Sequence, residues 1–181
     1  MYFRIFIALL IALATLGARA APSMLNDLAV LTDKAGTLTI AAVASADPAQ
    51  FKPLPSGGFA GGFSRSAFWF RFTVARAGET WLDIQPPVLD DLRLFEPDPQ
   101  RAGAWLERRA GDTLPFAARE VPYRSFVFKL RHADADPHTY YLRLATTSSA
   151  VLSARLMTPD DFITTTTTDC NVVLGSRGNR C

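Results

Sequence analysis

The stretch that decides the fold spans residues 68–74 and reads Phe68-Trp69-Phe70-Arg71-Phe72-Thr73-Val74. A β-strand points successive side chains to opposite faces of a sheet. One face of this strand would carry the three phenylalanines and the valine, and the other would carry the tryptophan, the arginine and the threonine. A helix would scatter the same residues around its circumference. We therefore predict a strand with one face in a hydrophobic core.

The same period of two extends outward into five further segments, which are residues 80–84, 91–95, 125–130, 139–144 and 151–156. Residues 38–43 also read as a strand, and turn sequences such as Pro86-Pro87 and Asp136-Pro137 separate the segments. About eight short strands with almost no helix predict an all-β fold. The expected architecture is an antiparallel two-sheet sandwich of the jelly-roll type.

Two segments before the central strand lack this alternation. Residues 22–34 carry apolar side chains every three to four positions, which favours a short helix or an irregular lead-in. Residues 47–66 contain many prolines and glycines, so we expect a long surface loop. The side chains expected to anchor this loop in the core are those of Phe51, Leu54, Phe59 and Phe63.

The first twenty residues have the pattern of a cleaved signal peptide. An apolar stretch from Ile5 to Leu16 is followed by Gly17-Ala18-Arg19-Ala20, a small-x-small cleavage pattern. The alternative is a retained membrane anchor, but about twelve apolar residues form a helix of only about 18 Å, against a hydrocarbon core of about 30 Å. No other run is apolar enough to span a bilayer. We expect an exported, periplasmic protein with one β-sandwich domain over residues 21–162.

The C-terminal residues 163–181 differ in character from the domain. Five threonines, Thr164 to Thr168, lead into a polar segment without periodicity, so we expect a disordered tail. Cys170 and Cys181 are the two cysteines, and an oxidising compartment would permit a disulfide between them. Such a bridge would close only a short loop in the tail.

Composition limits the possible partners. The formal net charge is +2, with 19 basic and 17 acidic residues dispersed along the chain, so no basic stripe exists for a nucleic acid. Thirteen phenylalanines, three tryptophans and four tyrosines indicate a packed aromatic core.

Catalytic motifs are missing from the sequence, and we predict no cofactor and no enzyme activity. Neighbouring acids such as Asp90 and Asp91 would point to opposite faces of a strand and would not converge on one substrate atom. His132 and His138 flank an acidic loop that suggests a weak metal site, but no third ligand has suitable spacing, and a solvated hairpin loop is the favoured explanation. A hydrolase on this sandwich is therefore the least favoured hypothesis.

Four residues are candidates for ligand binding. Trp69 and Arg71 share a strand face, where an aromatic ring beside a guanidinium suits a sugar or a carboxylate. Alternatively, Trp69 packs under the 47–66 loop and Arg71 pairs with a carboxylate. Asp112 and Arg119 flank a turn and form either a ligand clamp or a charge pair that fixes the loop. Trp81 and Trp105 are further stacking candidates.

Three stretches, in order along the chain, carry a resemblance to a known family: Ser66-Ala67-Phe68-Trp69-Phe70-Arg71-Phe72, Gly111-Asp112-Thr113-Leu114-Pro115-Phe116 followed by Arg119, and Tyr140-Tyr141-Leu142-Arg143. From about Leu31 to Phe162 the chain resembles the type 2 extracellular sensor domain of bacterial seven-transmembrane receptors with diverse intracellular signalling modules. The resemblance implies a jelly roll similar to carbohydrate-binding modules, located in the periplasm.

In this family the domain precedes seven membrane helices and a cytoplasmic output such as a histidine kinase or a diguanylate cyclase. The chain departs from that arrangement after Phe162, which suggests a truncation or a frame slip at the threonine run. The sequence thus predicts a periplasmic sensor domain for a small-molecule, carbohydrate-like ligand. The alternative is a protein-interaction module that dimerises or docks a partner.

Overall fold

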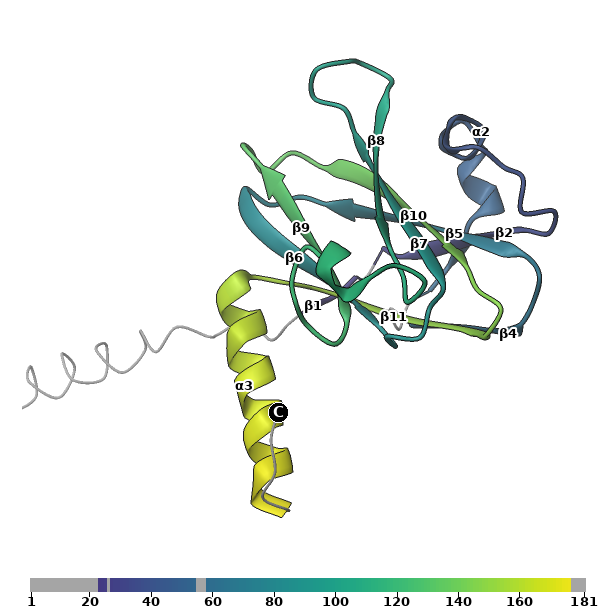
Figure 1. The fold of residues 1–181 in the computed structure, drawn as a ribbon. Coiled ribbons are helices and arrows are strands. Elements are labelled where there is room, and N and C mark those ends of the chain that lie inside the picture. Colours follow the sequence, from purple (N-terminus) through teal and green to yellow (C-terminus); the bar gives the residue numbers. More distant parts are fainter. Residues whose placement is uncertain (1–22, 26, 55–57, 177–181) are drawn as a thin grey trace, which may run out of the picture.

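Strand β5 (Ala67–Val74) lies near the middle of one of two antiparallel sheets that pack face to face (Figure 1). The structure is a computed structural model that describes residues 23–25, 27–54 and 58–176. The predicted all-β, two-sheet sandwich is confirmed.

The first sheet has the order β1-β11-β6-β9, and β4 also pairs with β11. Its strands are β1 (Ser23–Met24), β4 (Gly58–Phe63), β6 (Gly78–Gln85), β9 (Phe126–His132) and β11 (Ser149–Met157). The second sheet has the order β3-β2-β5-β10-β7-β8. Its strands are β2 (Ala29–Asp33), β3 (Lys52–Pro53), β5, β7 (Asp91–Pro97), β8 (Trp105–Ala110) and β10 (His138–Ala145). Short 3-10 helices at Pro48–Gln50 and Phe116–Ala118 lie in the connections.

The main core fills the space between the two sheets. Phe70 is 0% exposed and lies opposite Val30 of β2 and Leu142 of β10. The first sheet contributes buried side chains that include Leu82 and Phe128. Full burial of each such side chain stabilises the fold by about 1.5–3 kcal/mol. The predicted inward orientation of Phe68, Phe70 and Phe72 is therefore correct.

A second hydrophobic cluster covers the outer face of the second sheet. Trp69 is 1% exposed there and packs with Phe51 and Val43. Val43 belongs to helix α2 (Ile40–Ala44), so the strand predicted over residues 38–43 is wrong. The Thr39 hydroxyl caps this helix by accepting a hydrogen bond from Ala42 N–H at 3.3 Å. Capping and burial of one face outweigh the β-propensity of the segment.

The helix considered for residues 22–34 is also wrong, because β1 and β2 occupy this region. Leu28 and Val30 point into the main core, whereas Ala29 and Leu31 point into the outer cluster. Both faces of β2 are therefore covered by apolar groups. A strand buried on both faces loses the alternation that would reveal it in the sequence.

The predicted loop over residues 47–66 contains regular structure. It includes β3 and β4, and β4 pairs antiparallel with β11. Phe51 is buried, while Leu54 and Phe59 are partly buried against the main core, in agreement with the prediction. Phe63 is 84% exposed, so its predicted burial is wrong. Strand β8 was not predicted, because charged residues stand on both of its faces at a sheet edge.

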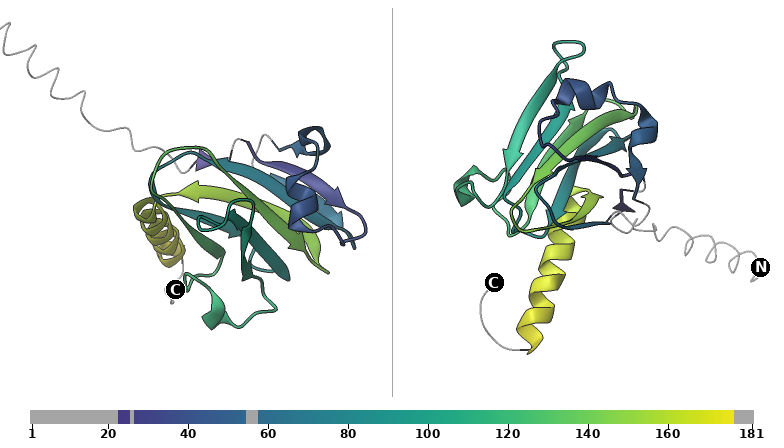
Figure 2. Two further views of the ribbon diagram at one scale, coloured as in Figure 1. Left: turned by 90° about the horizontal axis from the view of Figure 1, so that it is seen from above. Right: turned by 90° about the vertical axis from the view of Figure 1, so that its right-hand side faces the viewer.

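Helix α3 (Pro159–Ser176) follows β11 and extends away from the sandwich (Figure 2). As far as Ser176, the structure thus differs from the disordered tail expected over residues 163–181. The Thr158 hydroxyl accepts a hydrogen bond from Asp161 N–H at 3.1 Å, which caps the first turn. Phe162 is 5% exposed, and its burial is worth about 1.5–3 kcal/mol.

Two predictions concern parts that the structure does not describe. The predicted signal peptide, residues 1–20, and Cys181 lie outside the described residues, as does the side chain of Cys170. Among the helices of the described part, none combines the length and the apolar character needed to cross a bilayer.

Candidate ligand-binding site

A hollow of about 800 Å³ opens at one end of the sandwich. It lies where β4 and β10 end and β11 begins, and it also receives residues that precede β7 and follow β8. The lining residues are Phe63, Ser64, Arg65, Ser66, Asp90, Thr113, Ala145, Thr146 and Thr147. Loops that are far apart in the sequence therefore meet around one open space.

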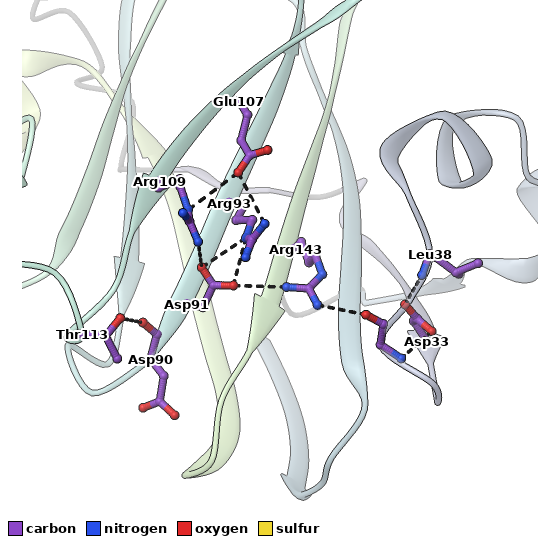
Figure 3. A network of polar contacts seen from close by, with 10 residues as sticks. Asp33, Leu38, Asp90, Asp91, Arg93, Glu107, Arg109, Thr113 and Arg143 are labelled. Carbon is purple, nitrogen blue, oxygen red and sulfur yellow. Dashed lines mark hydrogen bonds and ion pairs between the residues drawn. The ribbon is translucent and has the colours of Figure 1, made fainter.

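Hydrogen bonds within the protein hold the walls of the hollow in place. The Asp90 carboxylate accepts from Thr147 N–H at 2.6 Å and from the Thr147 hydroxyl at 2.7 Å. These two bonds keep the pKa of Asp90 below its ordinary value. The Thr113 hydroxyl donates to the Asp90 backbone carbonyl at 2.8 Å, as Figure 3 shows. Asp90 thus links the loop that contains Thr147 to the loop that contains Thr113.

The Phe63 ring and the Arg65 guanidinium are accessible to a ligand. Phe63 is 84% exposed. Arg65 is exposed and makes no hydrogen bond or ion pair with any residue in the described part of the chain. Between them, the Ser64 hydroxyl accepts from Ser66 N–H at 3.0 Å and fixes the turn. An aromatic face, an unpaired guanidinium and several hydroxyls are the groups that bind a polar ring compound.

An arginine network adjoins the hollow on the outer face of the second sheet (Figure 3). Asp91 accepts from Arg93 at 2.9 Å, Arg143 at 3.2 Å and Arg109 at 3.4 Å. Arg143 also donates to the Gly36 carbonyl at 3.3 Å. Asp90, which precedes β7, and Asp91, the first residue of β7, point in different directions, and each serves its own set of partners.

Trp69 and Arg71 lie on the same outer face, as predicted. The Trp69 ring stacks on Phe95 with centroids 5.4 Å apart, and α2 belongs to the cluster that covers it. The Arg71 guanidinium lies 4.6 Å from the centroid of the Phe51 ring. Within the described residues Arg71 has no ion pair. The burial of Trp69 supports the packing alternative, and the ligand role of this pair stays a prediction.

Asp112 and Arg119 serve different parts of the structure, and no hydrogen bond or ion pair joins them in the described ranges. Asp112 is exposed, and its N–H donates to the Leu89 carbonyl at 2.9 Å. The Arg119 guanidinium donates to three successive backbone carbonyls, those of Tyr123 at 2.5 Å, Arg124 at 2.8 Å and Ser125 at 3.3 Å. Arg119 therefore organises a turn, and a ligand clamp built from these two residues stays a prediction.

The other two tryptophans are partly buried. Trp105 meets Tyr141 edge to face, with ring centroids 5.2 Å apart. The Trp81 indole donates to Glu79 at 2.6 Å, and its ring packs against Phe162 with centroids 5.0 Å apart. Neither ring lines the end hollow.

The two histidines stack on each other, with ring centroids 4.3 Å apart. His132 Nε2 lies 2.5 Å from the Tyr140 hydroxyl, and His138 Nε2 lies 2.9 Å from the Asp134 carboxylate. Burial raises the pKa of Tyr140 to about 12, so this hydroxyl keeps its proton. No group of three or more potential ligands for a metal ion occurs among the described residues.

The His132 ring should make stability depend on pH. Burial lowers the pKa of His132 below its ordinary value of 6.5, and His138 lowers it further. As the pH falls below 6.5, the unfolded chain therefore binds the proton first. The stability that neutral His132 contributes is complete above this pH and is lost as the pH falls through the lower folded-state pKa.

We expect the urea midpoint of the wild type to fall between about pH 7.5 and about pH 5.5. In His132→Gln this fall should be smaller, because glutamine does not titrate. An equal fall in both proteins would contradict the assignment of this pH dependence to His132.

Comparison with known proteins adds one match. The family model described as 7TMR-DISM extracellular 2 matches residues 25–158. The matched range contains the three stretches on which the resemblance rests, and it agrees closely with the predicted extent. No curated protein matches the chain.

Proposed function

The chain belongs to the 7TMR-DISM extracellular 2 family, and from this premise we propose that it binds a carbohydrate-like ligand in the end hollow. A domain of this family is the sensor of a bacterial receptor on the extracellular side of the membrane, and such a domain is generally non-catalytic. The chain is therefore assigned to sensing, and the proposal concerns the ligand and its site.

One observation carries the proposal: the hollow combines the exposed ring of Phe63 with the guanidinium of Arg65, which has no partner among the described residues. A sugar ring can stack on the phenylalanine face while its hydroxyls receive hydrogen bonds from the arginine. Hydroxyl groups of Ser64, Thr146 and Thr147 add donors and acceptors around the opening. The walls are held by protein hydrogen bonds, so little ordering is needed when a ligand binds.

The proposal predicts ligand-dependent stabilisation that Phe63 supports. Thermal-shift and calorimetric titrations of the full chain with cellotriose, chitotriose and a peptidoglycan disaccharide-peptide should identify at least one ligand. For that ligand, Phe63→Ala and Arg65→Met should each weaken binding about tenfold, which corresponds to about 1.4 kcal/mol of lost stacking or hydrogen bonding.

A matched control is Leu106→Ala, which truncates another exposed apolar side chain that does not line the hollow. Its affinity should equal that of the wild type. Failure of all three compounds to bind would contradict the carbohydrate assignment. Binding that survives both Phe63→Ala and Arg65→Met unchanged would contradict the site.

A dimerisation module is the second candidate, and strand β4 favours it. β4 reads Gly58-Phe59-Ala60-Gly61-Gly62-Phe63 and carries no charged side chain. Its one partner strand in the described part is β11. Edge strands of monomeric proteins usually carry charges or prolines that prevent pairing with another chain. Light scattering should then show a dimer without added ligand, and a monomer at all concentrations would exclude this candidate.

A further inference from the structure

A third hydrophobic cluster holds helix α3 against the outer face of the first sheet. Its buried members are Val127, Met157 and Phe162, and Trp81 and Tyr123 pack against them. The Phe162 ring lies 5.0 Å from the rings of both Trp81 and Tyr123. Among residues 159–167, the part of α3 whose side chains are described, Phe162 is the one buried side chain. The helix therefore has one apolar anchor in this part.

Beyond this anchor, α3 is a weak helix. Threonine is β-branched and lowers helix stability, and five threonines follow one another from Thr164 to Thr168. The hydroxyls of Thr166 and Thr167 donate to the Ile163 carbonyl at 3.0 and 2.8 Å, contacts that compete with the helical pattern. The position of α3 thus depends on the packing of Phe162 in the third hydrophobic cluster.

Arg119 orders part of the site into which the Phe162 ring packs, and we call this site the seat of Phe162. The guanidinium binds the carbonyls of Tyr123 and the two residues that follow, which fixes the turn that presents the Tyr123 ring. The same guanidinium lies 4.7 Å from the ring centroid of Phe126, a residue of the main core. It also lies 5.0 Å from the ring centroid of Phe116. Arg119 therefore connects the segment Phe116–Ser125 to the rigid sandwich.

We propose that α3 is a releasable helix, that Phe162 is its latch, and that Arg119 is the positioning residue that keeps the latch site formed. The burial of one phenylalanine favours the docked state about ten- to a hundredfold, so the released state is a small but accessible population. A ligand or a membrane-side partner that favours one position would shift this equilibrium.

The segment that forms the seat begins close to the end hollow. Thr113 lines the hollow, and the chain continues from it through Arg119 to Tyr123, which contacts Phe162. One stretch of backbone thus joins the hollow to the helix that leaves the domain. The latch is a property of the fold, and it holds whichever ligand the hollow takes.

Hydrogen exchange measured by mass spectrometry on the full chain tests the latch. Phe162→Ala should raise exchange of the amides of residues 162–167 at least tenfold, because the docked state loses its anchor. Arg119→Met should raise exchange in residues 119–125 and also in residues 162–167. Peptides from β5 and β10 should keep the protection of the wild type, which separates release of α3 from general destabilisation.

Ile163→Ala is the matched control, because it truncates an apolar side chain that is 57% exposed on the same helix. Its exchange in residues 162–167 should not exceed that of the wild type. If Arg119→Met does not fold, Arg119→Lys, which keeps the charge but loses the forked donors, serves for the same comparison. Unchanged exchange of α3 in Phe162→Ala would overturn the latch. Faster exchange confined to residues 119–125 in the Arg119 variant would overturn its positioning role.

Discussion

A Gly111→Ala variant is expected to lose the native fold or to unfold at far lower denaturant concentration than the wild type. Gly111 has a φ angle of +144°, a conformation that residues with a side chain rarely adopt. A Cβ atom there would lie 2.1 Å from the Asp90 carbonyl oxygen and 2.8 Å from its carbon. Both are backbone atoms, so no rotamer change relieves the clash.

The expected cost is about 4 kcal/mol or more, a large part of the about 5–15 kcal/mol by which domains are stable. Urea unfolding followed by tryptophan fluorescence and far-ultraviolet circular dichroism would measure it. The matched control is Gly103→Ala, where φ is +78° and no heavy atom beyond the adjacent residues lies within 4 Å of the added Cβ. The control should cost only about 1–2 kcal/mol. Equal midpoints for the two variants would show that the clash is relieved.

The second large effect is expected for Phe70→Ala. Phe70 is 0% exposed, and its ring meets that of Phe59 in a T-shaped arrangement with centroids 5.2 Å apart. Truncation removes the buried ring and leaves a cavity between the sheets, which costs about 3–5 kcal/mol. The urea midpoint should fall accordingly, with little change in the slope of the transition.

Phe63→Ala is the control for this variant, because the same side chain is truncated at a position that is 84% exposed. Its stability should stay within about 0.5 kcal/mol of the wild type. A loss at Phe63 as large as that at Phe70 would mean that Phe63 is buried in solution, contrary to the structure.

The strands that were predicted correctly share one physical property. In β5, β6, β7, β9, β10 and β11 the inner face lies in the main core, so apolar side chains recur at every second position. The pattern fails in β2, where Val30 lies in the main core while Ala29 and Leu31, on the opposite face, lie in the outer cluster. β2 is covered on both sides, and its apolar residues imitate the spacing of a helix. The segment Ile40–Ala44 has β-propensity but forms a helix, because Thr39 caps its N-terminus.

Strand β4 shows a different limit. Its residues are glycine, alanine and phenylalanine, and glycines in a sequence indicate a loop. The strand forms because the backbone of β11 offers it hydrogen-bond partners. Those partners lie about ninety residues away along the chain, as in the pair Phe59 and Leu152, so local sequence carries no signal for them.

The candidate site was predicted less well than the fold. Alternation correctly placed Trp69 and Arg71 on one face, but it did not show that α2 and Phe51 cover that face. Asp112 and Arg119 stand close in sequence, yet backbone carbonyls satisfy the guanidinium. The end hollow combines loops from four parts of the chain. Serine and threonine are so common in turns that their presence does not indicate where loops form a binding site.

The strand order also determines when the chain can fold as it is synthesised. β10 lies between β5 and β7, and β11 is the common partner of β1, β4 and β6. Both strands come after residue 137. A nascent chain that ends before them therefore lacks the strand that connects the two halves of the second sheet and the shared partner strand of the first sheet. Folding must await almost the entire translated domain. Such non-local pairing is characteristic of proteins that fold over milliseconds to seconds.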